Sequence, residues 1–237
     1  MKTESIEYKD GDVTLRGFLA YEEAHSGRRP GVLVMPGGFG LGPNAKGRAE
    51  MLARLGYVAL AGDPYGDGLE VDDLKEVMKL VAGLRADSAK FRRRTRVALE
   101  KLKSLPQVDP GSIAAIGYCL GGTFVLELAR EGAPLKGVVT FHGGLETKDP
   151  AAPGQVKAKL LILTGADDPT VPAGHVNALA EEMTKAGADW RIVSYSGTKH
   201  GFTYPDAATR KVEWIEHNQL TDERSWKAMR SFFEEIF

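Results

Sequence analysis

Apolar residues in this chain follow two spacings, which alternate from one end of the sequence to the other. Mostly apolar runs with the length of buried strands occupy residues 32–35, 58–61, 137–141 and 159–164. Between residues 72 and 84 the apolar side chains instead recur every three or four positions, at 74, 77, 78, 81 and 84. This second spacing places them on one face of a helix.

The same patterns extend over the rest of the chain. Strands are also expected at 112–116 and 191–196, and the turn after Tyr8 followed by residues 14–20 predicts an edge hairpin. Further helices are expected at 88–105 with Ser88 as a cap, 123–129, 173–186, 222–237, and from a cap near Asn44 to Leu55. Strands that alternate with helices favour a mostly parallel central sheet flanked by helices on both faces. We therefore expect one α/β domain over residues 1–237, with little or no cap domain.

Composition and charge exclude some functional classes. The chain holds 31 basic and 32 acidic residues, so no long-range field draws it to nucleic acid or to an anionic membrane. The run of arginines at 92–96 is expected to be a solvated helix face. No apolar run approaches the roughly 18 residues of a membrane span. The charged first seven residues are unlike a signal peptide, and a single cysteine forms no internal disulfide, so we expect a cytoplasmic protein.

That single cysteine, Cys119, lies at the centre of Gly-Tyr-Cys-Leu-Gly-Gly at residues 117–122. A predicted strand precedes it and a predicted helix follows, as in a nucleophile elbow, where the turn residue exposes its side chain above the sheet. The helix N-terminus would favour a thiolate. The alternative is a buried core cysteine. The flanking glycines and the strand–turn–helix context favour a nucleophile.

An acid and a base follow in the order that such a nucleophile requires. The strand at 159–164 leads into Gly-Ala-Asp-Asp-Pro-Thr-Val-Pro at 165–172, and the strand at 191–196 leads to His200 in a glycine-containing loop. Either Asp167 or Asp168 could orient the histidine at this stage. No Cys pair, acidic cluster or His-Glu-x-x-His sequence predicts a metal, and we expect no cofactor.

The motif around Cys119, Asp-x-x-Val-Pro at 168–172 and His-Gly-Phe at 200–202 together resemble the dienelactone hydrolase family. The segments at 32–41 and 56–66 fit the same pattern, so the resemblance covers the chain from about residue 14 to its end. It implies an α/β-hydrolase fold. It also implies an enzyme that hydrolyses carboxylic esters or lactones, with Cys119, Asp168 and His200 as its catalytic triad. Asp168 is preferred because it matches the family acid three residues before Val171.

The resemblance also implies an oxyanion hole. Its donors would be the backbone N–H of Leu120 and that of Gly38, with Phe39 as the adjacent alternative to Gly38. In the best-known members a glutamate stands at the position of Gly37, and an arginine that grips the substrate carboxylate stands at that of Tyr204. Without these charges we expect a neutral, less polar substrate.

Five residues are candidates for lining the substrate site: Gly37, Phe39, Tyr118, His142 and Tyr204. For His142 a purely packed histidine is the alternative. The same thiolate could attack neutral aryl phosphotriesters, and a catalytically silent hydrolase-like binding module is the non-enzyme alternative. We expect a small-molecule partner and a monomer or homodimer. The physiological substrate, its acyl or leaving group and the resting ionisation of Cys119 stay open.

Overall fold

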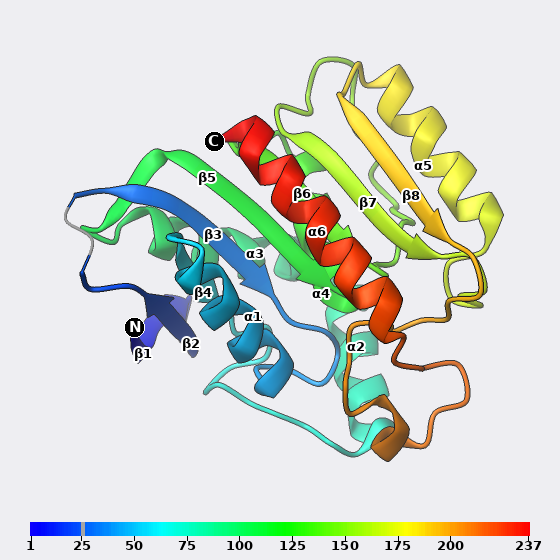
Figure 1. The fold of residues 1–237 in the computed structure, drawn as a ribbon, viewed down its shortest axis with the longest axis horizontal. Helices are drawn as coiled ribbons and strands as arrows, with labels where there is room; N and C mark the ends of the chain where they lie inside the picture. Colours follow the sequence, from blue (N-terminus) through cyan, green and yellow to red (C-terminus); the bar gives the residue numbers. More distant parts are fainter. Residues whose placement is uncertain (25–26) are drawn as a thin grey trace. The chain divides into compact units, whose positions relative to one another are not determined.

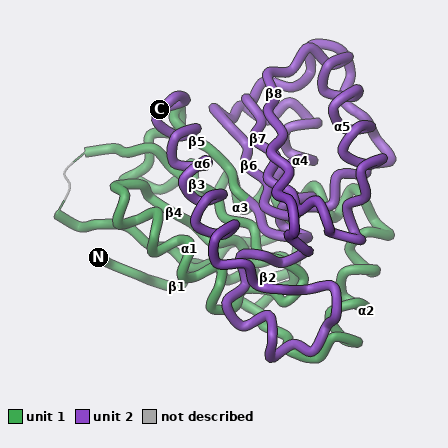
Figure 2. The backbone as a smooth tube through the Cα atoms, turned by 45° about the vertical axis from the view of Figure 1, so that its right-hand side comes forward, with its two compact units in different colours: residues 1–116 green, residues 117–237 purple. Residues whose placement is uncertain are grey.

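The computed structural model describes residues 1–24 and 27–237. The chain divides into two compact units, residues 1–116 and 117–237, which Figure 2 colours separately. The expectation of one domain over residues 1–237 stays a prediction.

The first unit is built on five strands in the order β1-β2-β4-β3-β5. They are β1 (Lys2–Asp10), β2 (Val13–Tyr21), β3 (Arg29–Met35), β4 (Val58–Ala61) and β5 (Val108–Tyr118), the last of which ends two residues beyond the unit. β2 pairs antiparallel with β1 and β4, whereas β3 and β4 are parallel, with Val34 opposite Ala61. Figure 1 shows α1 (Pro43–Arg54) in front of these strands and α3 (Ser88–Lys103) behind them, so apolar strand residues are covered on both faces.

The second unit holds three parallel strands, β6 (Gly137–Phe141), β7 (Lys159–Gly165) and β8 (Trp190–Tyr195). Every residue of β6 is buried, as the continuous apolar run predicts for a strand covered on both faces. In Figure 1, α6 (Gln219–Ile236) crosses in front of β6 and β7, and α4 (Leu120–Arg130) lies behind. The remaining helices are α5 (Ala173–Lys185) and a short 3₁₀ turn at Ala207–Arg210. The predicted α/β class with mostly parallel strands is confirmed.

Several predicted element boundaries are wrong, mostly by a few residues. α2 (Leu74–Ala86) is capped by Asp73 and α3 by Asp87, whose side chain accepts the N–H of Lys90, so Ser88 is not the cap. Asn44 is not a cap either, since α1 follows Gly42 and has proline at its first position. α6 begins three residues earlier than expected because Asn218 caps it. β1 is longer than expected because most of its side chains are exposed and polar, which hides the strand from a search for apolar runs.

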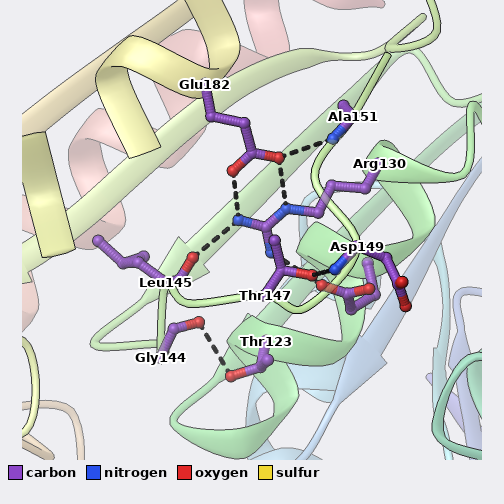
Figure 3. Close-up of polar contacts among 9 residues, drawn as sticks. Thr123, Arg130, Gly144, Leu145, Thr147, Asp149, Ala151 and Glu182 are labelled. Carbon is purple, nitrogen blue, oxygen red and sulfur yellow. Dashed lines mark hydrogen bonds and ion pairs between the residues drawn. The ribbon is translucent and has the colours of Figure 1, made fainter. Parts of the chain in front are cut away.

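A buried charge cluster fixes the segment that follows β6 (Figure 3). The side chain of Arg130, at the end of α4, is 1% exposed. It forms a bidentate pair with Glu182 of α5, at 2.9 and 2.8 Å, and a further ion pair with Glu127 at 2.9 Å. Arg130 also donates to the carbonyl of Leu145 at 2.7 Å, and Glu182 accepts the N–H of Ala151 at 2.9 Å. The cluster therefore ties two helices to the loop between β6 and β7.

Among residues 1–24 and 27–237, none of the helices combines the length and the hydrophobicity that crossing a bilayer requires.

Candidate active site

Cys119 occupies a strained turn between β5 and α4. Its backbone has φ 52° and ψ −118°, a region that residues with a side chain rarely adopt. A Cβ on Gly117 would lie 2.0 Å from the carbonyl oxygen of Gly121, and one on Gly122 would lie 2.3 Å from Oγ1 of Thr140. Only glycine fits at these two positions, so the first and the last glycine of the Gly-Tyr-Cys-Leu-Gly-Gly motif are steric requirements of this fold. The predicted strand–turn–helix geometry is present.

The turn places the sulfur at a helix N-terminus. Cys119 is the N-cap of α4 and is half-buried, and its carbonyl accepts the N–H of Gly122 at 2.9 Å. The first N–H groups of a helix, here beginning with Leu120, have no acceptor within the helix and carry its positive dipole end. An anionic sulfur, or an oxyanion next to it, is stabilised at such a position.

Asp168 and His200 form the other half of the site. Nδ1 of His200 lies 2.7 Å from Oδ2 of Asp168, and both side chains are buried. Thr170 donates through its hydroxyl and its backbone N–H to Oδ1 of Asp168, at 2.7 and 2.8 Å. Asp167 is exposed, and its N–H bonds to the carbonyl of Thr198. Of the two neighbouring aspartates, Asp168 is therefore the one that orients the imidazole.

The pKa values of His200 and Asp168 depend on the contacts of these two residues with each other and with Cys119 and Thr170. Burial is the largest influence on the pKa of His200 and lowers it. The negative charge of Cys119 and the bonds to Asp168 and to Cys119 outweigh burial and raise this pKa from 6.5 to about 10. Burial raises the pKa of Asp168, but its bonds with His200 and Thr170 leave that pKa below its ordinary value of 3.8. At neutral pH these contacts favour a protonated His200 beside the carboxylate of Asp168.

Aromatic rings surround the imidazole of His200. His142 lies edge-on to it with ring centroids 5.0 Å apart, and Trp214 does the same at 5.6 Å. The ring of Tyr204 lies 5.3 Å from that of His142. Tyr204 is buried, and burial together with the nearby charge of Cys119 holds the pKa of its hydroxyl well above 10.0. The imidazole of His200 is thus packed between the rings of His142 and Trp214.

The structure brings together most of the predicted site residues of the second unit. His142 is fully buried and contacts Cys119 and His200. Tyr118 is also fully buried and stacks on Phe141 with ring centroids 4.6 Å apart. Both side chains are thus packed inside the second unit. That they line the substrate site stays a prediction.

The predicted residues of the first unit lie in a tight turn after β3. The N–H of Gly40 donates to the carbonyl of Gly37 at 3.1 Å, and Tyr65 donates its hydroxyl to the carbonyl of Gly38 at 2.7 Å. A Cβ on Gly38 would lie 3.1 Å from side-chain atoms of two valines of α2. Phe39 is half-buried and accepts the N–H of Val71. The backbone carbonyl groups of Gly37, Gly38 and Phe39 thus accept the hydrogen bonds that hold this turn.

Three contacts of the site were missed by sequence reasoning. Thr170 bonds to Asp168, and its hydroxyl lies 3.0 Å from Nδ1 of His200. A hydroxyl two residues after an aspartate is a common turn signal, so Thr170 could have been found. Thr203, beside His142, and Trp214, beside His200, gave no local signal because each contact depends on the path of the loop after β8.

The fold and the site together define an α/β hydrolase with a cysteine at the nucleophile elbow. The chain belongs to the dienelactone hydrolase family, whose profile matches residues 15–237. The resemblance inferred from the motifs is therefore confirmed, and the protein is an enzyme of a class that hydrolyses esters and lactones.

Three relatives illustrate this position. A dienelactone hydrolase-like promiscuous phosphotriesterase from metagenomic libraries is 38% identical, with a TM-score of 0.95 over 100% of this chain and 98% of its own. An uncharacterized protein of Caenorhabditis elegans is 32% identical over 63% of this chain and 96% of its own length. A probable 2-oxo-3-(5-oxofuran-2-ylidene)propanoate lactonase of Bradyrhizobium is 29% identical over 85% and 86%, respectively. The α/β-hydrolase fold expected from the sequence is confirmed.

Proposed function

We propose that Cys119, His200 and Asp168 form the catalytic triad of a cofactor-independent hydrolase of neutral carboxylic esters or lactones. The observation that carries the proposal is the coupling of His200 to two opposite charges. It bonds to Asp168 at 2.7 Å, and Cys119 raises its pKa toward 10. A structural cysteine would have no need of a strained turn, a helix N-terminus and a buried imidazole at once.

The reaction follows from these positions. The Cys119 thiolate attacks the carbonyl carbon, and negative charge collects on the carbonyl oxygen. The N–H of Leu120, at the start of α4, and that of Gly38, in the turn after β3, are proposed as the oxyanion donors; each such donor contributes about 3 kcal/mol in comparable enzymes. His200 gives its proton to the leaving alkoxide. His200 then takes a proton from water, which hydrolyses the thioester and regenerates the thiolate.

Asp168 has a supporting role in both steps. Its carboxylate holds the proton on Nδ1 of His200, so Nε2 is the nitrogen that exchanges protons with the sulfur, the leaving group and water. Thr170 holds Asp168 in turn, through two bonds to the oxygen that does not face Nδ1. Because Gly37 carries no carboxylate, we propose that His200 and the N-terminus of α4 keep Cys119 ionised without a further acid.

The substrate class is inferred from the absent charges. Tyr204 stands where the family archetype has an arginine, and its buried hydroxyl stays neutral, as the raised pKa shows. Neither Tyr204 nor Gly37 itself supplies a cation for a substrate carboxylate, and Arg210, whose guanidinium lies 5.8 Å from the centre of the Tyr204 ring, is paired with Asp206 at 2.6 Å. We therefore propose uncharged aryl esters and lactones as substrates. A thiol nucleophile works only when reduced, so we place the enzyme in the cytoplasm.

A second activity has a specific observation in its favour. The relative that is 38% identical is described as a promiscuous phosphotriesterase. A neutral phosphotriester needs the same thiolate and oxyanion donors and no cation for a carboxylate. Attack by sulfur on phosphorus would expel the aryloxide and form a thiophosphate ester, which water must then cleave to restore the thiol. We propose this as a side activity of the same triad.

A panel of neutral aryl esters, lactones and aryl phosphotriesters tests both proposals, with wild type and Cys119→Ala compared on each substrate. A fall in kcat/KM of about a thousandfold, or 4 kcal/mol, in the variant supports Cys119 as the nucleophile. Several equivalents of product per enzyme separate true turnover of a triester from a single inactivating event. Ester activity that survives in Cys119→Ala would refute the triad.

A further inference from the structure

His142 stands at a position that ordinary packing does not require of a histidine. It follows the last residue of β6, is fully buried, and has φ +41°. A non-glycine residue rarely adopts this conformation, and it persists only where surrounding contacts hold it. Its backbone N–H donates to the carbonyl of Leu163 at 2.8 Å, so the main chain is fixed.

The two ring nitrogens of His142 have different partners. Nδ1 lies 3.2 Å from the backbone nitrogen of Cys119, whose N–H also bonds to the carbonyl of Phe141 at 3.0 Å. A backbone N–H is always a donor, so Nδ1 must accept and carries no proton. The ring proton is therefore on Nε2, which donates to Oγ1 of Thr203 at 2.8 Å. The contacts define a neutral imidazole with one tautomer.

The same ring also supports the base. Its centroid lies 5.0 Å from that of His200 at an interplanar angle of 66°, and 4.9 Å from that of Phe202. An uncharged ring can stand beside the His200 imidazolium without repelling it, whereas a second imidazolium could not. His142 thus touches the backbone of the nucleophile and the ring of the base.

We propose that His142 is a positioning residue. Held as the neutral Nε2–H tautomer between the Cys119 amide and Thr203, it fixes the strained turn of the nucleophile relative to the imidazole of His200. This inference rests on the proposed function, since it assigns His142 a part in the same triad. Its side chain is fully buried, and the contacts that carry the proposal are those to Cys119, Thr203 and His200.

Two variants at position 142 separate positioning from packing. His142→Asn places an amide oxygen near the position of Nδ1 and tolerates positive φ. His142→Gly tolerates positive φ as well but removes both hydrogen bonds and the ring. Thr203→Val keeps His142 and removes only the acceptor of its Nε2–H. For each variant we would measure kcat and KM on a neutral aryl ester, the rate of Cys119 alkylation by iodoacetamide, and the unfolding temperature.

We expect His142→Gly to lower kcat and the alkylation rate together by about tenfold or more, the scale of one lost hydrogen bond, with KM within about twofold. His142→Asn should recover both rates to within about threefold, and Thr203→Val should lower them by an intermediate factor. The inference is overturned if His142→Gly and Thr203→Val keep the wild-type kcat and alkylation rate. It is also overturned if His142→Asn loses as much of both rates as His142→Gly and the losses follow the fall in unfolding temperature.

The parallel measurement on Cys119→Ala keeps the two proposals apart. Should that variant retain ester hydrolysis, the triad itself fails. If activity depends on Cys119 but kcat and the alkylation rate do not change in the His142 and Thr203 variants, only the positioning role fails.

Discussion

The charge coupling between Cys119 and His200 makes a prediction that does not depend on any substrate. A pKa of about 10 for His200, against an ordinary 6.5, corresponds to roughly 5 kcal/mol of net stabilisation of the imidazolium. Cys119 supplies part of this through its charge and its hydrogen bond, whereas burial acts in the opposite direction. In Cys119→Ala the charge and the bond are lost but burial stays. The pKa of His200 should therefore fall in the variant, toward or below its ordinary range.

The direction of the pKa shift of His200 determines the pH range in which the titration is measured. Because the pKa is raised, wild-type His200 keeps its proton at pH 7 and releases it only as the pH rises toward 10. In Cys119→Ala the release should move to lower pH. The assay is an NMR titration of the imidazole signals, assigned with His200→Gln, together with the thiolate absorbance of wild type in the ultraviolet. The reasoning is refuted if wild-type His200 titrates near 6.5 and Cys119→Ala leaves that pKa unchanged.

Three substitutions test the supporting structure. Asp168→Asn should lower kcat by about 10³–10⁴ with little change in KM, because the His200 tautomer is no longer fixed. Arg130→Met should lower the free energy of unfolding by about 3–5 kcal/mol, measured by urea denaturation, since it removes the cation that is paired with two largely buried glutamates. Gly117→Ala should abolish ester hydrolysis, because its Cβ would meet the Gly121 carbonyl at 2.0 Å.

Each substitution has a matched control. Asp167→Asn should keep nearly full activity, and equal losses at 167 and 168 would contradict the assignment of the acid. Replacing Arg130, Glu127 and Glu182 together with apolar residues should recover much of the stability that Arg130→Met loses. A loss of less than about 1 kcal/mol in the free energy of unfolding of Arg130→Met would contradict a stabilising role for the buried charge cluster. Gly47→Ala, where a Cβ meets nothing within 4 Å, should stabilise α1 by about 0.5–1 kcal/mol.

The parts of the site that could be predicted are those marked by residues close together in the sequence. The elbow could be predicted because close contacts demand glycine at positions 117 and 122, on either side of Cys119. Asp168 and His200 could be predicted because each follows the end of a strand, in the chain order of the fold. Buried strands such as β6 were recognised for a similar reason, since a strand covered on both faces is apolar throughout.

The parts that escaped prediction depend on contacts between distant segments. Nothing near Trp214 indicates that its ring lies 5.6 Å from that of His200. His142 was expected to line the substrate site or to be packed, and only the coordinates reveal its bond to the Cys119 amide. Helix starts were misplaced because Asp73 and Asp87 compete with neighbouring polar residues as caps, and short-range patterns do not decide between them. β1 was underestimated because its exposed side chains are polar.

The central claim is that the sulfur of Cys119 forms a covalent intermediate. The most direct test is to mix the enzyme with p-nitrophenyl acetate, quench with acid during turnover, and map the mass of every peptide. Deacylation slowed by Asp168→Asn would help the intermediate accumulate. We expect one acetyl group on the peptide that carries Cys119, and none after Cys119→Ala. Turnover without any acetyl group on Cys119, or with the group on another residue, would contradict it.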